Sequence, residues 1–278
     1  MRRIFFFSFV STISLVVFGQ SNPLDKASVR CYYQFAQKDQ ANQLQIDTMT
    51  LDIGAQMSEY YDIAKQKQDS LQSVYFSKID PTTIRAISVL KGKSALDHIN
   101  SGGAAFSTGR PKESARLYKN RQTGEIVIID YIPTVPDKYR FVEIIRPQDW
   151  QITPDTATIL GYPCQKAMST FRGRNYEAWF SPEIPVNDGP WKFFGLPGLI
   201  MKVFDSQNIF SFVCVGIENL VPPHDLTIAQ EKFINCSRDE LAKIKLKQRG
   251  ETRISNNGGN IVIASLSAKD NYQSLELE

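Results

Sequence analysis

The sequence predicts a mainly β protein in which residues 20–278 form a single domain around a curved antiparallel sheet, either an open half-barrel or a sandwich. Apolar residues recur with a period of two in many segments, which is the spacing of strands. Turn residues separate these segments at short intervals, which favours antiparallel pairing. The chain has 278 residues, 42% of them hydrophobic and 22% charged. This is a globular composition, and no internal repeat or linker divides the chain.

The first half of the chain predicts two strands and an exposed helix. The strands are expected at residues 29–35 and 49–53. Residues 60–75 are rich in glutamine, lysine and aspartate, and a few apolar residues recur among them at loose helical spacing. We therefore expect a strand end that runs into an exposed helix.

Residues 80–110 predict an insertion that contains the first of a few short helices. Pro81 suits the first turn of a helix, and apolar residues follow it at a spacing of three over 84–90. Residues 101–105 are rich in glycine and alanine, which predicts a loop. Such a segment is a candidate lid, although a mobile surface element is its more common role.

The hairpin pattern is clearest from residue 117 onward. A turn at 122–124 separates the predicted strand 117–120 from 125–132, which is apolar on both faces and therefore expected at the centre of the sheet. Turns at 172–174 and 205–208 predict two more hairpins. The remaining predicted strands are 139–145, 165–171, 175–181, 199–204 and 209–217.

The C-terminal part changes character. Ser237 and Glu240 form the pattern of a capping box, and apolar residues follow at helical spacing, so a short amphipathic helix is expected there. Residues 256–260 predict a loop. Residues 266–278 are mostly polar, and we expect them to be frayed.

Residues 1–19 are predicted to be a secretory signal peptide. Two arginines precede the apolar run 4–18, and Gly19 is small enough to precede a cleavage site. A membrane anchor is the alternative, but the run is shorter than the roughly 20 residues that a spanning helix needs. Because the first cysteine is Cys31, an N-terminal lipoprotein is not expected. The protein is therefore expected in the periplasm or cell envelope, peripheral to the membrane at most.

The charge of the chain is nearly balanced. The 32 basic and 29 acidic residues give a net charge of +3, and removal of the two leader arginines leaves 30 against 29, or +1. Such a balance offers no argument for nucleic acid or for an anionic membrane surface as a partner.

Cysteine and histidine are scarce, which limits the chemistry. Export permits disulfides, with buried free thiols as the alternative. The candidate cysteines are Cys31, Cys164, Cys214 and Cys236. No Cys-x-x-Cys occurs, and neither His98 nor His224 has ligand spacing from a cysteine, so we expect no metal and no cofactor. Neither histidine adjoins a nucleophile elbow, which argues against a serine hydrolase.

The most informative segment is 176–203, and its decisive part is 189–200. This part reads Gly-Pro-Trp-Lys-Phe-Phe and then Gly-Leu-Pro-Gly-Leu-Ile. Gly195, Pro197 and Gly198 predict a structural turn, in which Pro197 and Gly198 form the central pair of a type II turn and Gly198 supplies the positive φ. The large apolar side chains around this turn are Trp179, Trp191, Phe193 and Phe194. They either pack a rigid corner of the fold or form an exposed platform that binds a ligand or a partner.

The hexapeptide at 195–200 is the signature of the GLPGLI family, which this chain resembles over roughly 155–217, including residues 176–180 and 189–193. Members of that family are exported envelope proteins of Gram-negative bacteria with no assigned activity. The resemblance therefore implies a compartment and a β-rich fold, and it implies no reaction.

We expect a non-enzymatic envelope protein that either carries a small apolar ligand or docks an envelope partner. A deep apolar cavity would favour the carrier, and a filled core with an exposed aromatic patch would favour docking. The alternative is a secreted hydrolase that uses a carboxylate pair such as Glu177 and Glu183, which would need a cleft holding two acids with raised pKa values. A structural subunit of an envelope complex is the third hypothesis.

Overall fold

The structure is a computed structural model. It describes residues 23–277 except 40, 92, 101–105, 108–114, 132–137, 230, 248–251 and 266–274. The predicted signal peptide 1–19 and the predicted loop 101–105 lie outside the described residues.

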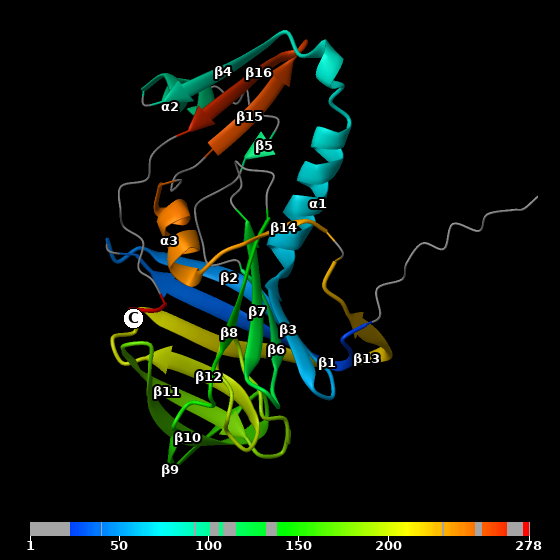
Figure 1. Cartoon of the computed structure of the whole chain (residues 1–278). Coiled ribbons are helices and arrows are strands. Elements are labelled where there is room, and N and C mark those ends of the chain that lie inside the picture. The colour runs from blue at the N-terminus through cyan, green and yellow to red at the C-terminus, as the bar shows by residue number, and fades with distance from the viewer. Residues whose placement is uncertain are drawn as a thin grey trace, which may run out of the picture.

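A large antiparallel sheet dominates the described chain and confirms the predicted mainly β class. Its twelve strands, in spatial order, are β14 (Phe233–Asn235), β8 (Lys138–Ile144), β7 (Glu125–Tyr131), β6 (Arg116–Asn120), β3 (Met57–Asp62), β2 (Leu44–Ile53), β1 (Asp25–Lys38), β13 (Phe210–Leu226), β12 (Leu199–Asp205), β11 (Arg174–Ser181), β10 (Tyr162–Phe171) and β9 (Gln151–Ile159). The short β14 pairs in parallel with β8, whereas the other neighbours are antiparallel. The sheet is curved and not closed, and β6–β8 cross over its other half (Figure 1).

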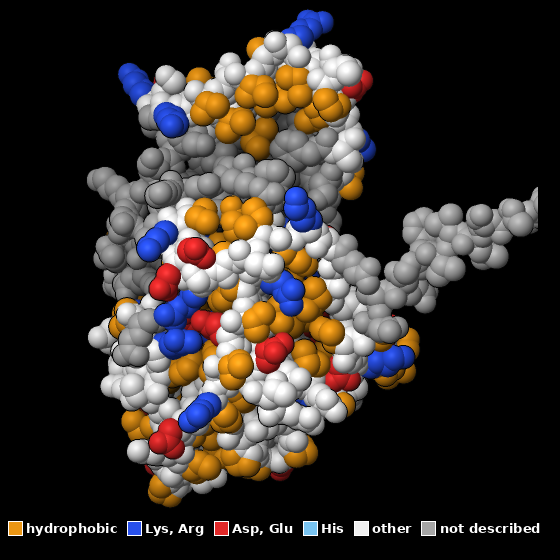
Figure 2. Space-filling view, viewed as in Figure 1, with side chains coloured by type: hydrophobic (Ala, Val, Ile, Leu, Met, Phe, Trp, Pro, Cys, Tyr) orange, Lys and Arg blue, Asp and Glu red, His pale blue; other side chains and the backbone are white. Residues whose placement is uncertain are grey.

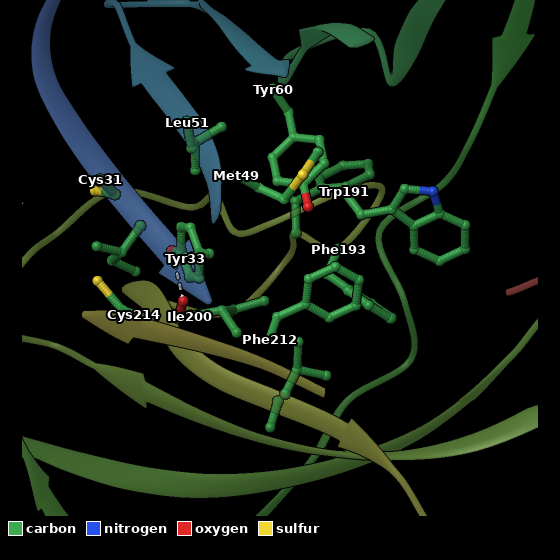
Figure 3. Packing of buried hydrophobic residues seen from close by; sticks show 14 of the residues in the cluster. Cys31, Tyr33, Met49, Leu51, Tyr60, Trp191, Phe193, Ile200, Phe212 and Cys214 are labelled. Carbon is green, nitrogen blue, oxygen red and sulfur yellow. Dashed lines mark hydrogen bonds between the residues drawn. The ribbon is translucent and has the colours of Figure 1, made fainter. Parts of the chain in front are cut away.

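The core fills the inside of this curve. Residues of β1 and β2 pack there with residues of β6, β7 and β10–β13 and with the segment that precedes β12. Phe35 stacks on Phe212 with ring centroids 4.6 Å apart. The hydroxyl of Tyr33 donates to the carbonyl of Ile200 over 2.7 Å, which satisfies this buried polar group (Figure 3).

A second sheet of four strands lies at the top of Figure 1. In spatial order its strands are β4 (Ala86–Lys91), β16 (Asn260–Ser265), β15 (Thr252–Asn257) and β5 (Phe106–Ser107). The helix α2 (Lys93–Asn100) packs on it through Ala95 and Ala264. Hydrophobic side chains gather on the face turned toward the viewer in Figure 2.

This second sheet corrects two predictions. The predicted insertion does contain short helices, the 3-10 helix Pro81–Thr83 and α2, but the apolar spacing of three over 84–90 belongs mostly to the strand β4. The predicted loop 256–260 contains the tight turn of the hairpin β15–β16, with Gly258 and Gly259 at positive φ. The first error arises because β4 pairs with β16, about 170 positions later in sequence, a contact that local periodicity does not report.

The two helices predicted outside the insertion are confirmed. The helix α1 (Ile63–Ser77) follows β3 directly and leads toward the second sheet (Figure 1). The helix α3 (Arg238–Lys247) begins with the predicted capping box: the Ser237 amide donates to Glu240 Oε2 over 2.7 Å, and the Glu240 amide donates to Ser237 Oγ over 3.2 Å. No helix among the described residues is both long and apolar enough to cross a membrane.

The described end of the chain contradicts the prediction that 266–278 is frayed. Leu275 belongs to the core and is only 2% exposed. Tyr176 donates to its carbonyl over 3.3 Å. Residues 266–274 lie outside the described residues.

Candidate functional site

The predicted aromatic cluster is part of the core. Trp191, Phe193 and Phe194 are 7%, 0% and 3% exposed, and the Phe193 ring lies edge-on to Tyr176 at 4.7 Å and to Trp191 at 5.2 Å. These three side chains therefore cannot form the exposed platform that was one of their two predicted roles. They pack the corner of the fold (Figure 3).

Trp179 has different surroundings. It is half-buried on β11, and its Nε1 donates to Glu177 Oε1 over 3.0 Å. The Lys166 ammonium lies 5.9 Å from the centroid of its ring. Of the four predicted aromatic residues, Trp179 alone has a partly accessible ring, and charged neighbours already contact it.

The predicted turn at 195–198 forms, but its geometry differs from the prediction. Gly195 has a φ of +106°, and a Cβ there would lie 2.7 Å from the Cβ of Pro147. Gly198 does not have positive φ: its amide donates to the carbonyl of Leu196 over 2.8 Å, which makes a γ-turn around Pro197 in place of a type II turn. Gly198 is required for space, because a Cβ there would lie 2.1 Å from the carbonyl oxygen of Ser181.

An ion-pair network joins this corner to the middle of the sheet. Asp188 Oδ1 accepts from Lys119 Nζ over 2.5 Å, and Asp188 Oδ2 accepts from Arg121 Nη1 over 3.0 Å. Lys119 Nζ also donates to the carbonyl of Gly189 over 2.5 Å. Burial lowers the pKa of Lys119, and the nearby Asp188 carboxylate opposes that effect. The network is enclosed and has a structural role.

All four cysteines are free thiols in the structure, so no predicted disulfide is present. Cys31, Cys164 and Cys214 are buried as small apolar residues, and Cys236 is half-buried. Cys31 and Cys214 lie on the paired strands β1 and β13, and a hydrogen bond between their thiols, together with burial, raises the pKa of Cys31. Within the described ranges, no group of three His, Cys, Asp or Glu residues is arranged to hold a metal ion.

The two predicted carboxylates, Glu177 and Glu183, have different surroundings. Glu177 forms an ion pair with Lys166 at 2.9 Å, and Glu183 is exposed in the turn that follows β11. His98 Nε2 is 3.1 Å from Ser255 Oγ in the second sheet, whereas His224 lies at the end of β13. These residues are dispersed over the described structure.

A different set of residues, three charged and one tyrosine, lies on the face of the large sheet opposite the core. Arg30, Asp52, Glu59 and Tyr118 occupy paired positions on β1, β2, β3 and β6, so they form one row across four strands. Arg30 binds Asp52 through two hydrogen bonds of 2.6 and 2.8 Å. The hydroxyl of Tyr61 donates to the same carboxylate over 3.2 Å. Asp52 and Glu59 are only 0% and 5% exposed.

This row ends at an open cleft of about 190 Å³, here called the Arg116 cleft. It lies between the start of α1, the strands β6–β8 and the chain that follows β13. Its lining residues are Tyr61, Asp62, Lys65, Gln66, Arg116, Tyr118, Ile129, Lys138, Thr227, Ala229 and Glu231. The lining contains three cations and two carboxylates, so it is polar. Each cation has an ion-pair partner: Asp130 for Lys65, Glu59 for Arg116 and Glu231 for Lys138.

Arg116 is the residue best placed to bind a ligand in this cleft. Its Nη1 lies 3.1 Å from Glu59 Oε1 and 3.4 Å from the hydroxyl of Tyr118, and its guanidinium lies 5.3 Å from the centroid of the Tyr61 ring. The side chain is 31% exposed. Among the described contacts, no hydrogen bond uses its Nε or Nη2, and the residue lines the cleft.

Burial raises the pKa of Glu59, and the positive charge of Arg116 opposes that rise. Burial likewise raises the pKa of Tyr118 to about 12. The hydroxyl of Tyr118 donates to the carbonyl of Thr227 over 3.0 Å, which ties the cleft wall to the chain after β13.

The sequence analysis did not identify the Arg116 cleft. The available signal was the row of charged and tyrosine residues at alternate positions of strands that are otherwise apolar. That signal becomes informative only when the pairing of β3 with β6 is known, because these strands are separated by more than 50 residues.

Comparison with known proteins finds a family-model match over the corner and a fold likeness for the chain. A family model described as "Protein of unknown function (Porph_ging)" matches residues 169–202. That segment runs from β10 through the corner into β12 and contains the hexapeptide 195–200. No curated protein matches this chain.

Among solved structures, PNGF-II in the P21 space group is similar to this chain with a TM-score of 0.50 and 12% sequence identity, over 83% of this chain and 35% of that chain. PNGF-II in the C2 space group gives a TM-score of 0.49 at the same identity and coverage. This chain thus spans 35% of the length of PNGF-II. At 12% identity the likeness concerns the β-rich fold alone.

Proposed function

We propose that this chain is a non-catalytic, exported binding protein of the cell envelope, and that the Arg116 cleft holds an acidic group of its ligand. The observation that carries this proposal is the geometry of Arg116. Glu59 and Tyr118 contact its Nη1, and Tyr61 lies against the guanidinium. No described hydrogen bond uses Nε or Nη2, and Arg116 lines an open cleft.

The chemistry of the cleft favours a carboxylate, phosphate or sulfate group. A guanidinium presents its donors as a planar fork that matches two acceptor oxygens. Lys65 and Lys138 lie in the same lining, where Asp130 and Glu231 pair with them. These paired charges favour a small acidic group over a polyanion.

The size and polarity of the cleft argue against a bulky apolar cargo. Sites for drug-sized molecules typically enclose roughly 300–1,000 Å³ with mainly apolar walls. The Arg116 cleft encloses about 190 Å³, and charged residues form much of its lining. The aromatic residues predicted to surround the corner are mostly packed in the core, and the described cleft is polar, so the docking of an acidic group has more support than the carrier form of the hypothesis.

The alternative of a carboxylate-pair hydrolase receives little support. Glu177 and Glu183 are both absent from the cleft lining, and Glu177 is already paired with Lys166. Glu59 does have a raised pKa near the cleft, but its carboxylate faces Arg116 and is almost fully buried. We therefore propose a role for Glu59 in orienting Arg116.

Export is tested separately from binding. Protein purified from the periplasm or envelope fraction of its own cells should begin at Gln20 on N-terminal sequencing, because the predicted leader ends at Gly19. A cytosolic protein that retains Met1 would contradict export without affecting the binding proposal.

Binding is tested by isothermal titration calorimetry with inorganic phosphate, sulfate and succinate. At least one of them should bind the native protein, and Arg116→Gln should abolish that binding. Arg116→Lys should bind more weakly than the native protein, because it keeps the charge and loses the fork. Arg146→Gln, which removes an exposed arginine outside the cleft, is the control. Equal binding by the native protein and Arg116→Gln would refute the site, as would no binding of any of the three anions.

A further inference from the structure

The end of the chain is held on the large sheet by specific contacts. Leu275 is buried, and its carbonyl accepts from the hydroxyl of Tyr176. Two residues later, the amide of Leu277 donates to the carbonyl of Arg172 over 3.1 Å. These bonds fix the backbone on both sides of Glu276, so its side chain enters its surroundings in one orientation.

Glu276 meets three cations, which come from three different parts of the fold. Lys192 Nζ lies 2.5 Å from Oε1, and Arg238 Nη1 lies 3.1 Å from Oε2. Arg172 Nε lies 3.9 Å from Oε1. Lys192 belongs to the corner, Arg172 to the turn between β10 and β11, and Arg238 to the first turn of α3.

Besides Glu276, one acidic residue contacts all three of these cations among the described ion pairs. Glu143 lies 2.5 Å from Lys192, 3.5 Å from Arg172 and 4.0 Å from Arg238. Without Glu276, Glu143 would be the one carboxylate that the three cations share among the described ion pairs, although Arg238 would keep its exposed neighbour Asp239 at 3.6 Å. The side chain of Lys192 is only 6% exposed. Because unbalanced buried charge is costly, the cluster requires a second carboxylate.

The contacts define a compact recognition site, here called the tail site: Arg172, Tyr176, Lys192 and Arg238 with Glu143. Two features give it specificity. An apolar position accepts a leucine side chain into the core, and the adjacent cluster accepts a carboxylate. Arg172, Tyr176 and Lys192 all lie within the segment 169–202 that the family model matches.

We propose that the tail site is a peptide-binding site that recognises a leucine followed by an acidic residue, and that it binds an acidic segment of a partner protein. The C-terminal segment of this chain is its internal occupant and competes with that partner. This inference goes beyond the Arg116 cleft and does not depend on it, because the two sites share none of their lining residues.

The test uses fluorescence anisotropy with a labelled synthetic peptide that corresponds to residues 271–278. The receptor is the full-length mature protein carrying Leu275→Ala and Glu276→Ala, which should vacate the tail site. This variant should bind the peptide about tenfold or more tightly than the native protein, because the native tail competes as a tethered ligand at high effective concentration. A peptide with lysine in place of the glutamate that corresponds to Glu276 should not bind.

A matched pair of variants on α3 tests whether the peptide binds at the tail site. In the vacated background, Arg238→Ala should weaken binding, whereas Lys243→Ala on the same helix should leave it unchanged. Circular dichroism and thermal melting check that each variant is folded. Equal peptide binding by the native and vacated proteins would overturn the proposal, as would binding that ignores the charge of the peptide. A native dimer that Glu276→Lys dissociates would show that a second copy occupies the site, and it would overturn the assignment to a different partner.

Discussion

Lys119 and Asp188 form an ion pair that is almost completely removed from water. Lys119 Nζ lies 2.5 Å from Asp188 Oδ1, and the two side chains are 2% and 0% exposed. The pair joins β6 to the corner at a sequence distance of 69 residues. Because Lys119 Nζ also donates to the carbonyl of Gly189, it is bonded to both the Asp188 carboxylate and the backbone at the start of the corner.

Asp188→Ala should destabilise the protein by about 3–5 kcal/mol, because it leaves Lys119 charged and buried without its partner. Urea denaturation followed by tryptophan fluorescence measures this free energy of unfolding. Glu231→Ala is the control, since its partner Lys138 is exposed and such pairs contribute about 1 kcal/mol or less. If Asp188→Ala costs no more than this control, the buried pair is not needed for the corner.

Phe193→Ala should cost about 3–5 kcal/mol of unfolding free energy, because its ring is fully buried among other aromatic rings. Trp179→Ala should cost less, since Trp179 is only half-buried. Urea denaturation of the two variants measures both free energies of unfolding. A folded Phe193→Ala protein of native stability would contradict the core assignment.

Gly198→Ala should destabilise the protein more than Gly161→Ala. At Gly198 the new Cβ would lie 2.1 Å from a backbone oxygen, so the corner must move. At Gly161 no atom lies within 4 Å, and only the positive φ of +83° is penalised, at about 1 kcal/mol. Thermal unfolding of the two variants makes the comparison, and the reverse order of their melting temperatures would show that the close approach is not rigid.

Anion binding at the Arg116 cleft should strengthen as pH falls through the pKa of Glu59. Burial raises this pKa above its ordinary value of 4.5, so the folded protein takes up a proton more readily than the free side chain would. Protonation removes the negative charge that competes for Arg116. The other groups that influence Glu59 are Asp52, Tyr118 and His224.

Calorimetric titration with the anion that binds best, at a series of pH values above and below 4.5, measures this dependence. Glu59→Gln should remove this component of the pH dependence and bind as the protonated protein does. A pH dependence that is unchanged in Glu59→Gln would assign the effect to another group. Glu59→Gln also tests how Glu59 affects the free energy of unfolding. A carboxyl group whose pKa is raised by folding stabilises the protein at low pH, and this contribution is lost as pH rises through the folded-state pKa.

Much of the large sheet could be predicted from sequence, because alternation reports a strand wherever one face is buried and turn residues mark its ends. The hairpin β10–β11 and the capping box of α3 are examples. The strand β9 was missed because most of its side chains are exposed or half-buried, so it lacks the apolar alternation of a strand on the core. The second sheet was missed because β4 depends on pairing with the distant β16.

The conformation of the corner depends partly on local sequence and partly on tertiary contacts. The glycines, prolines and aromatic residues of 189–200 predicted a rigid turn, and a turn is present. Which glycine needs positive φ, and which needs only space, depends on Pro147 and Ser181, which pack against the turn from elsewhere in the chain. Composition likewise could not decide whether Trp191 is exposed, because that depends on what covers it.

The sequence alone determined the mainly β class, the principal hairpins and the structural corner, since each follows from backbone preferences and hydrophobic spacing within a few residues. Only the tertiary structure decided that the aromatic residues are core, that Arg30, Asp52, Glu59 and Arg116 share one face of the sheet, and that Glu276 meets Lys192. Charged groups separated by tens of residues come together through strand pairing and sheet curvature. Their chemistry therefore depends on distances that the order of residues along the chain does not contain.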